Sequence, residues 1–277
     1  MLLRRLRLDD IPAAAQLTAE AFGGVAREAR IRRYLTLEPE GWFGLEDAGG
    51  LVAIGGVIRY LRFAWLGLMA VRPQRQREGL GRTLAETAIE WAREHGCPSV
   101  CLIATPAGVP LYRRLGFVPD GDSSELTGVP QVSHPVQGPC SVRPWAEADT
   151  PEVARFDAPA FGADRTRVLA AYADEFSRSA WVARNRGGAV CGYLVVQDES
   201  LGPWAASDEA AAGQLLDVGL AGTERSLRAG VLDDVGERLL LARGLVRTRA
   251  LPRMRLGPPV ARASRPRLLA HASYAVG

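Results

Sequence analysis

The stretch of sequence that decides the fold is Leu66–Arg82, which reads LGLMAVRPQRQREGLGR. Its apolar first part, residues 66–71, is typical of a buried strand, and a loop of arginine and glutamine follows. Gly79-Leu80-Gly81 then opens a helix. Glycine amides at a helix N-terminus, beside arginine side chains, favour a bound phosphate, because the first N–H groups are unpaired and the helix dipole is positive there. The stretch therefore predicts a strand, an anion-binding loop and a helix.

The patterns around this stretch alternate between helix and strand. The helix after the loop, about residues 79–95, places Leu80, Leu84 and Ala88 on one apolar face, and Gly96 ends it. A short apolar run at 99–104 predicts a strand buried on both faces. Five further segments are expected before the loop, with strands at 2–8, 41–46 and 51–61 and helices at 11–21 and 25–37.

The second half of the chain repeats the first. Arg4, Asp10, Pro12 and Ala21-Phe22-Gly23 recur as Arg143, Asp149, Pro151 and Ala160-Phe161-Gly162, at a constant offset of 139 residues. Two copies of one supersecondary unit are therefore expected.

The second copy departs from the first at the anion loop. The interval that holds the loop is seven residues shorter, and Ser207-Asp208-Glu209 stands where the glycines would be. Acidic side chains at a helix N-terminus repel an anion. Tyr112 of the first copy falls opposite Leu240. We expect the second half to keep the fold and to have lost the ligand site.

Composition and charge exclude several classes of protein. The 277 residues carry a net charge of +3, with all 34 basic residues being arginine, so a nucleic-acid-binding polycation is not expected. No apolar run is long enough for a membrane span. Four cysteines without a CxxC pair and three scattered histidines favour a reduced, cytoplasmic protein without a metal site.

Two motifs in the first half resemble those of the GNAT (GCN5-related N-acetyltransferase) superfamily. The first is Val71-Arg72-Pro73 followed by Gln76-x-x-Gly79-x-Gly81, and the second is Leu111-Tyr112-x-x-x-Gly116-Phe117. Their order, with a helix and a buried strand between them, makes the resemblance strong. The resemblance covers residues 1–127 well, and the second half is similar to the degenerate GNAT-like domain of tandem members.

The resemblance implies a role for each matched position. Backbone groups of Met69, Ala70 and Val71 would hold the pantetheine arm of acetyl-CoA, and Thr105 stands where the family often has a pantetheine-binding Asn. Tyr112 would protonate the departing thiolate as general acid. The residues expected around the pyrophosphate are Gln76, Arg77, Glu78, Gly79, Leu80, Gly81 and Arg82.

The general base is not defined by the sequence. Many members of the family carry a Glu on the strand before the loop or on the next strand, but residues 64–68 and 100–103 contain no carboxylate here. Three sources stay open: a water molecule, a carboxylate such as Glu20, or a carboxylate of the second half.

The expected fold is α/β (α+β), with two tandem GNAT-like domains, each a mixed, mostly antiparallel sheet flanked by helices. The expected boundaries are 1–128 for the catalytic domain, 129–139 for a linker, 140–257 for the degenerate domain and 258–277 for a C-terminal extension.

The expected function is direct transfer of an acetyl group from acetyl-CoA to an amine, on a small molecule or a peptide, in a ternary complex. The second half would shape the acceptor side or form a homodimer surface. The alternatives are a different acyl group or a hydroxyl acceptor, and a non-catalytic acyl-CoA-binding regulatory protein. No nucleic acid, membrane or metal partner is expected.

Overall fold

The computed structural model describes residues 1–132 and 138–277, so residues 133–137 of the expected linker lie outside the described residues. The chain forms two compact units. Unit 1 comprises Met1–Asp120, Met254–Val260 and Tyr274–Val276, and unit 2 comprises Gly121–Arg253, Ala261–Ser273 and Gly277. The domain boundaries expected from the sequence stay a prediction.

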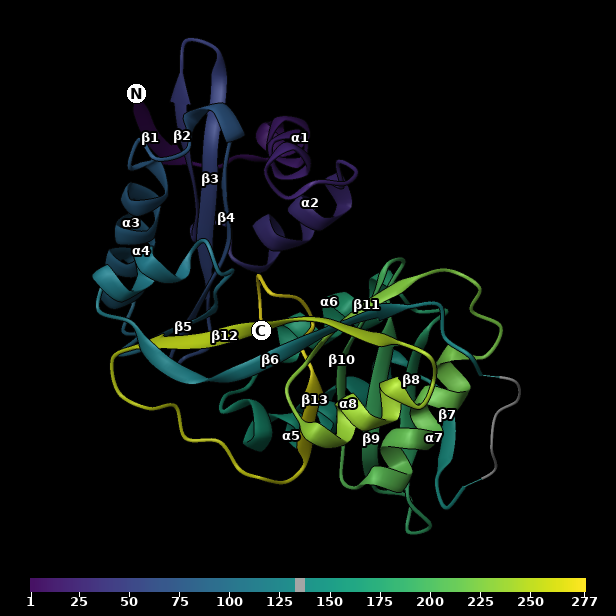
Figure 1. Ribbon diagram of the computed structural model, residues 1–277. Coiled ribbons are helices and arrows are strands. Elements are labelled where there is room, and N and C mark those ends of the chain that lie inside the picture. The colour runs from purple at the N-terminus through teal and green to yellow at the C-terminus, as the bar shows by residue number, and fades with distance from the viewer. Residues whose placement is uncertain (133–137) are drawn as a thin grey trace. The chain divides into compact units, whose positions relative to one another are not determined.

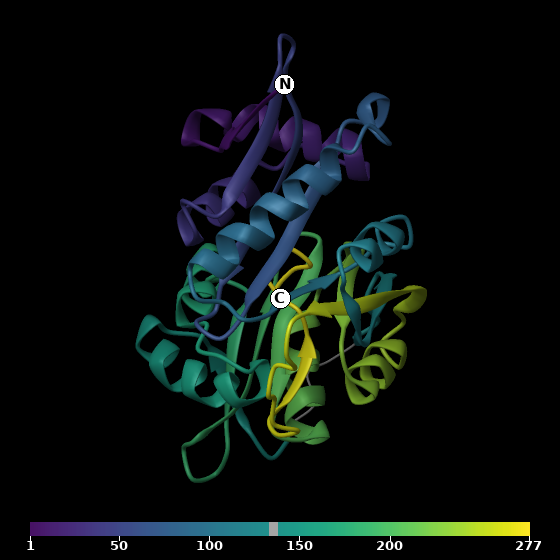
Figure 2. The same ribbon diagram turned by 90° about the vertical axis from the view of Figure 1, so that its left-hand side faces the viewer.

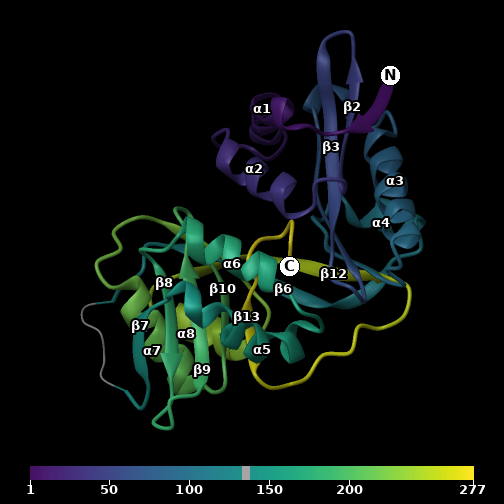
Figure 3. The ribbon, with the colours of Figure 1, turned by 180° about the vertical axis from the view of Figure 1, so that it is seen from behind.

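Unit 1 contains a mostly antiparallel sheet with helices on both faces. Its strands follow the order β1-β2-β3-β4-β5, in which only the pair β4–β5 is parallel. Figures 1 and 3 show α1 and α2 on one face of this sheet and α3 and α4 on the other. The elements are β1 (Leu2–Arg5), η1 (Leu8–Asp10), α1 (Ile11–Phe22), α2 (Glu28–Leu37), β2 (Trp42–Asp47), β3 (Gly50–Arg59), β4 (Ala64–Val71), η2 (Pro73–Arg75), α3 (Leu80–Glu94), β5 (Val100–Ile103) and α4 (Val109–Arg114).

The helix that follows the anion loop packs its apolar face on the sheet, as the 3.6-residue spacing predicts. Figure 2 shows α3 running across the strands. Its side chains Leu84, Ala88 and Trp91 are buried in one cluster with Leu66 of β4 and Val100 of β5. Because this face is held by many apolar contacts, the helix N-terminus is fixed at the end of β4.

Unit 2 has the same plan. Its strands β7-β8-β9-β10 are antiparallel neighbours, and β10 pairs in parallel with β11. Alternate residues of β9 enter two separate apolar cores. Leu194 packs in the core that contains residues of α7 and α8, and Tyr193 packs in the core that contains residues of α5 and α6. The elements are β6 (Val118–Gly128), β7 (Ser141–Pro144), η3 (Glu147–Asp149), α5 (Thr150–Phe161), α6 (Thr166–Glu175), β8 (Ala180–Arg184), β9 (Val190–Val196), β10 (Ser200–Ala206), α7 (Glu209–Leu220), β11 (Leu227–Val231), α8 (Asp234–Leu241), β12 (Val246–Leu256) and β13 (Arg267–Ala270).

The repeated residues do the same structural work in both units. Arg4 donates two hydrogen bonds, of 2.7 and 2.8 Å, to the carboxylate of Asp10, which also accepts the backbone N–H of Arg7. Arg143 donates two, of 2.7 and 2.6 Å, to Asp149, which accepts the N–H of Ala146. The first pair ties β1 to the start of α1, and the second ties β7 to the start of α5. The repeat seen in the sequence is therefore confirmed.

Each unit also contains a strand from the opposite half of the sequence. Unit 1 includes the end of β12, whose Met254 and Leu256 pack in its core, and β12 is the sheet neighbour of β5. Unit 2 includes β6 from Gly121 onward, which pairs with β11. Residues 258–277, expected as an extension, supply β13 to unit 2 and Tyr274–Val276 to unit 1. The repeat relates the two halves of the chain by a constant offset and does not indicate with which unit each final strand packs.

Candidate active site

The site begins where β4 and β5 separate. The two strands pair only through Ala64↔Val100 and Trp65↔Cys101. From Leu66 onward, no described strand pairs with β4 on that side. An open strand edge presents unpaired N–H and C=O groups to any extended ligand. The edge includes Met69, Ala70 and Val71, the residues expected to hold the pantetheine arm.

A β-bulge interrupts β4 at the same place. Its pairing with β3 shifts register between Gly56↔Gly67 and Ile54↔Ala70, and Leu68 lies in the left-handed region with φ of 55°. Gly55 of β3 faces the bulge, and a Cβ there would come within 2.3 Å of the Met69 sulfur. A bulge turns backbone groups out of the ladder. This one directs part of β4 away from β3, beside the open edge.

The expected anion loop joins the end of this strand to α3. Gly79 is the N-cap of α3 in the left-handed conformation, with φ of 84°, and no side chain of residues 1–132 or 138–277 caps the helix. The backbone N–H groups of Arg77–Gly81 donate no hydrogen bond within the described part of the chain. Since the first helical amides point along the axis, the loop offers a set of aligned donors at the positive end of the dipole.

The arginines of the loop are not equivalent. Arg75 forms ion pairs with Asp47 and with Glu78, so its charge is already balanced. Arg82 pairs with Glu86 at 2.8 Å on the exposed face of α3. Arg77 is exposed and, among the described residues, has no ion-pair partner. Exposed pairs contribute little and exchange readily, so Arg77 and Arg82 are the loop cations available to a ligand.

The remaining loop residues differ in what they can offer. The Gln76 amide lies 3.4 Å from the Val71 carbonyl oxygen, so its side chain faces the end of β4. Leu80 is buried in the core and can contribute only its backbone. The Glu78 carboxylate is turned to Arg75. Gly81 leaves space, since a Cβ there would lie 3.7 Å from Val71, at ordinary contact distance.

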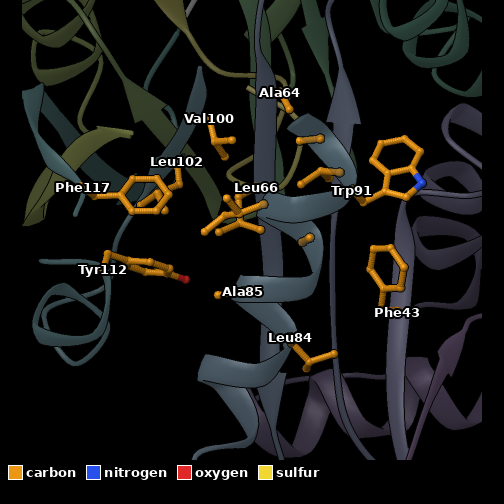
Figure 4. Close-up of a cluster of buried hydrophobic side chains, with 14 of the residues drawn as sticks. Phe43, Ala64, Leu66, Leu84, Ala85, Trp91, Val100, Leu102, Tyr112 and Phe117 are labelled. Atoms are coloured by element: carbon orange, nitrogen blue, oxygen red, sulfur yellow. The ribbon is translucent and has the colours of Figure 1, made fainter. Parts of the chain in front are cut away.

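Tyr112 lies on α4 and enters the same apolar cluster as Leu66. Its ring packs edge-on against Phe117 with 5.6 Å between centroids. Figure 4 shows its hydroxyl directed toward the side of α3 that carries Ala85. Burial raises the pKa of the Tyr112 phenol above its ordinary value, so the hydroxyl keeps its proton at neutral pH. It can therefore act as a donor, not as a base.

Two other expected residues have local partners. The Thr105 hydroxyl accepts the N–H of Gly108 at 3.2 Å, which closes the turn before α4. Glu20 of α1 lies 3.9 Å from Arg72, just past the end of β4. Glu20, one of the open sources of a base, is thus placed at the loop end of β4.

The sequence patterns missed one part of unit 1, the segment Tyr274–Val276. The Trp65 indole donates to the Tyr274 carbonyl at 3.1 Å, and the Tyr60 hydroxyl donates to the Val276 carbonyl. A Cβ on Gly67 would lie 2.4 Å from Ala275. The segment therefore covers β4 immediately before the bulge. A glycine inside a strand is the signal that could have indicated such a close approach.

The described residues contain no group of three or more His, Cys, Asp or Glu side chains arranged for a metal ion. Within residues 1–132 and 138–277, no helix has both the length and the apolar character that a bilayer span requires.

The split strands, the bulge and the glycine loop define the class of protein. Residues 11–117 match the acetyltransferase (GNAT) family, and residues 153–267 match a second family described as an acetyltransferase (GNAT) domain. The chain therefore belongs to the GNAT acetyltransferases and carries two GNAT domains in tandem.

Individual relatives agree with this placement. An uncharacterised N-acetyltransferase of Bacillus subtilis, YitH, is 27% identical over 195 residues, which are 69% of this chain and 68% of the relative. A candidate acetyltransferase from Pyrococcus horikoshii has a TM-score of 0.85 at 23% identity, covering 100% of this chain and 95% of the other. A tandem GNAT protein from the clavulanic acid biosynthesis pathway has a TM-score of 0.61 at 15% identity, covering 93% and 99%. These solved structures confirm the expected fold class.

Proposed function

We propose that unit 1 binds acetyl-CoA along the open edge of β4 and transfers the acetyl group to an amine. The observation that carries this proposal is the continuity of the edge with the uncapped N-terminus of α3. A pantetheine arm paired with residues 69–71 would lead its pyrophosphate to the amides of residues 77–81. Arg77 and Arg82 would add charge-assisted hydrogen bonds to the phosphate oxygens.

The thioester would lie beside the bulge, where β4 turns away from β3. A backbone N–H on the open edge would donate to the thioester carbonyl and stabilise the negative charge that develops on its oxygen. The Met69 side chain fills the space above Gly55, where a Cβ would come within 2.3 Å of the sulfur, so glycine at position 55 leaves room for the bulge.

The reaction would proceed by direct attack of the amine nitrogen on the thioester carbon. The carbon–sulfur bond breaks, the nitrogen loses a proton to a base, and the thiolate of coenzyme A receives a proton from Tyr112. The phenol suits this step because its raised pKa keeps it protonated until the thiolate forms. Water, Glu20 and a carboxylate of the second half remain the candidate bases.

We propose that the acceptor approaches the face of β4 opposite α3. Leu66 points to the α3 side, so its neighbours Trp65 and Gly67 face the other way. Tyr274–Val276 covers that face up to the bulge. In this proposal the segment bounds the acceptor site and limits which amines reach the thioester.

Unit 2 would bind no acetyl-CoA. The Asp208 carboxylate occupies the N-terminus of α7, where it accepts the N–H of Ala211 at 2.9 Å. A carboxylate at this position takes the place that a phosphate would need. We therefore expect one cofactor site in each chain.

A non-catalytic role in sensing acyl-CoA is the second candidate function. The observation in its favour is the lack of any carboxylate on β4 or β5. Release of free thiol from acetyl-CoA, measured with a panel of amines, separates the two. If thiol release occurs with any amine, and its rate is lower in Tyr112→Phe, the result supports acetyl transfer. Tight coenzyme A binding without turnover on the whole panel supports the sensor.

A further inference from the structure

Two cysteines of unit 2 lie in contact although they are far apart in the sequence. The Cys140 and Cys191 sulfur atoms are 3.3 Å apart, and 51 positions separate the residues. Cys140 immediately precedes β7, and Cys191 lies in β9, with β8 between the two strands. The sulfur contact therefore spans the width of β8.

The contact is held by the backbone and not by the sulfurs alone. The Gln214 side chain on α7 accepts the N–H of Cys140 at 3.1 Å and donates to its carbonyl at 2.7 Å. Cys191 is fixed in β9, where its carbonyl accepts the N–H of Ser207 at 2.8 Å. Both residues also pack against the same apolar core. The sulfurs are thus presented to each other by rigid elements.

Their surroundings differ in a way that assigns an order of reaction. Cys140 is partly exposed, whereas Cys191 is buried. Burial, with the neighbouring Cys140 thiol and the Asp208 carboxylate, raises the pKa of the Cys191 thiol. An oxidant from solvent therefore meets Cys140 first, and Cys191 is the second thiol.

We propose that Cys140 and Cys191 form a reversible disulfide when the protein meets hydrogen peroxide. The Cys140 sulfur attacks one peroxide oxygen, the O–O bond breaks, and a sulfenic acid and one water form. The Cys191 sulfur then attacks the sulfenic sulfur, the S–O bond breaks, and the departing hydroxide leaves as water with the thiol proton. The sulfurs need to approach by about 1.3 Å to reach bonding distance.

The cross-link would fasten the chain just before β7 to β9. Closing a loop of this length raises the unfolding temperature of the unit by about 10 °C, since it restricts the unfolded chain. The cofactor site of unit 1 contains neither cysteine, so this inference does not depend on the proposed function.

The test uses the full-length, fully reduced protein treated with hydrogen peroxide. Remaining thiols are alkylated, and peptides are mapped by mass spectrometry without reduction. We expect a loss of two hydrogens, one Cys140–Cys191 linked peptide, alkylated Cys97 and Cys101, and reversal by dithiothreitol. In Cys191→Ser, dimedone should trap a sulfenic acid at Cys140. Cys97→Ser is the matched control and should keep the cross-link.

Three results would overturn the proposal. In the first, Cys140 is alkylated after peroxide to the same extent as Cys97. In the second, the disulfide joins two different chains. In the third, Cys140 of the wild-type protein is oxidised to sulfinic acid and forms no disulfide. The mapping of the wild-type protein decides the matter even if a variant folds poorly.

Discussion

Gly79 is the residue at which the proposed cofactor site can be tested most sharply. It holds φ of 84°, and no atom of the described residues lies within 4 Å of the position that a Cβ would take. Gly79→Ala therefore acts through the backbone and not through a clash. The left-handed backbone conformation costs about 1 kcal/mol more for alanine than for glycine, so the loop in the variant can relax toward a right-handed conformation.

The magnitude follows from the donors that this relaxation would turn away. A hydrogen bond to a charged group contributes about 1.5–3 kcal/mol. The loss of one such bond to the pyrophosphate weakens coenzyme A binding roughly 10- to 100-fold, at 1.4 kcal/mol for each factor of ten. The unfolding free energy should fall by only about 1 kcal/mol.

The assay is isothermal titration with coenzyme A, with Gly81→Ala as the matched control. A Cβ on Gly81 would make only ordinary contacts, 3.7 Å from Val71 and 3.8 Å from Leu111, so this variant should bind within a few-fold of the wild type. Unchanged affinity in Gly79→Ala would refute the reasoning. An equal loss in both variants would show that bulk, and not backbone conformation, matters there.

Three further predictions concern the chemistry, the acceptor side and the fold. Tyr112→Phe should lower turnover about 100-fold and leave coenzyme A affinity unchanged, and equal turnover would remove the general-acid role. Gly67→Ala should displace Tyr274–Val276 and so change the relative rates with different amines, while coenzyme A binding stays the same. Unchanged relative rates would contradict the proposal that this segment bounds the acceptor site. Burial acts to raise the pKa of Asp149, but hydrogen bonds from Arg143 and Arg184 outweigh it and lower the value to about 2. The ionised carboxylate therefore stabilises unit 2 at pH values above the pKa of an unfolded Asp, which is about 4. In denaturant titrations the free energy of unfolding should fall by about 2 kcal/mol between pH 5 and pH 2, and this loss should be absent in Asp149→Asn.

Local patterns of the sequence predicted most of the fold. The 3.6-residue face of α3, the buried run of β5 and the repeated Arg–Asp pairs each depend on near neighbours, so the sequence displays them directly. The same kind of local pattern predicts an anion site at the loop, because glycine and arginine at a helix start are the residue types that phosphate binding favours, and this role stays a prediction.

Contacts between distant segments could not be predicted. The Tyr274–Val276 segment reaches β4 although 209 positions separate Tyr274 from Trp65, and only Gly67 marks its place. The parting of β4 and β5 after Trp65 and the bulge at Leu68 both follow from pairing register and not from composition. Arg75 forms one of its ion pairs with Asp47 on β2, 28 positions away, so the sequence alone could not show that the charge of Arg75 is balanced.

The central claim is that one of two similar units carries the cofactor site. The stoichiometry of coenzyme A binding, measured by isothermal titration of the full chain, tests it most directly. The account predicts one coenzyme A per chain, with that binding weakened in Gly79→Ala. Two sites per chain, or one site indifferent to Gly79→Ala, would contradict it.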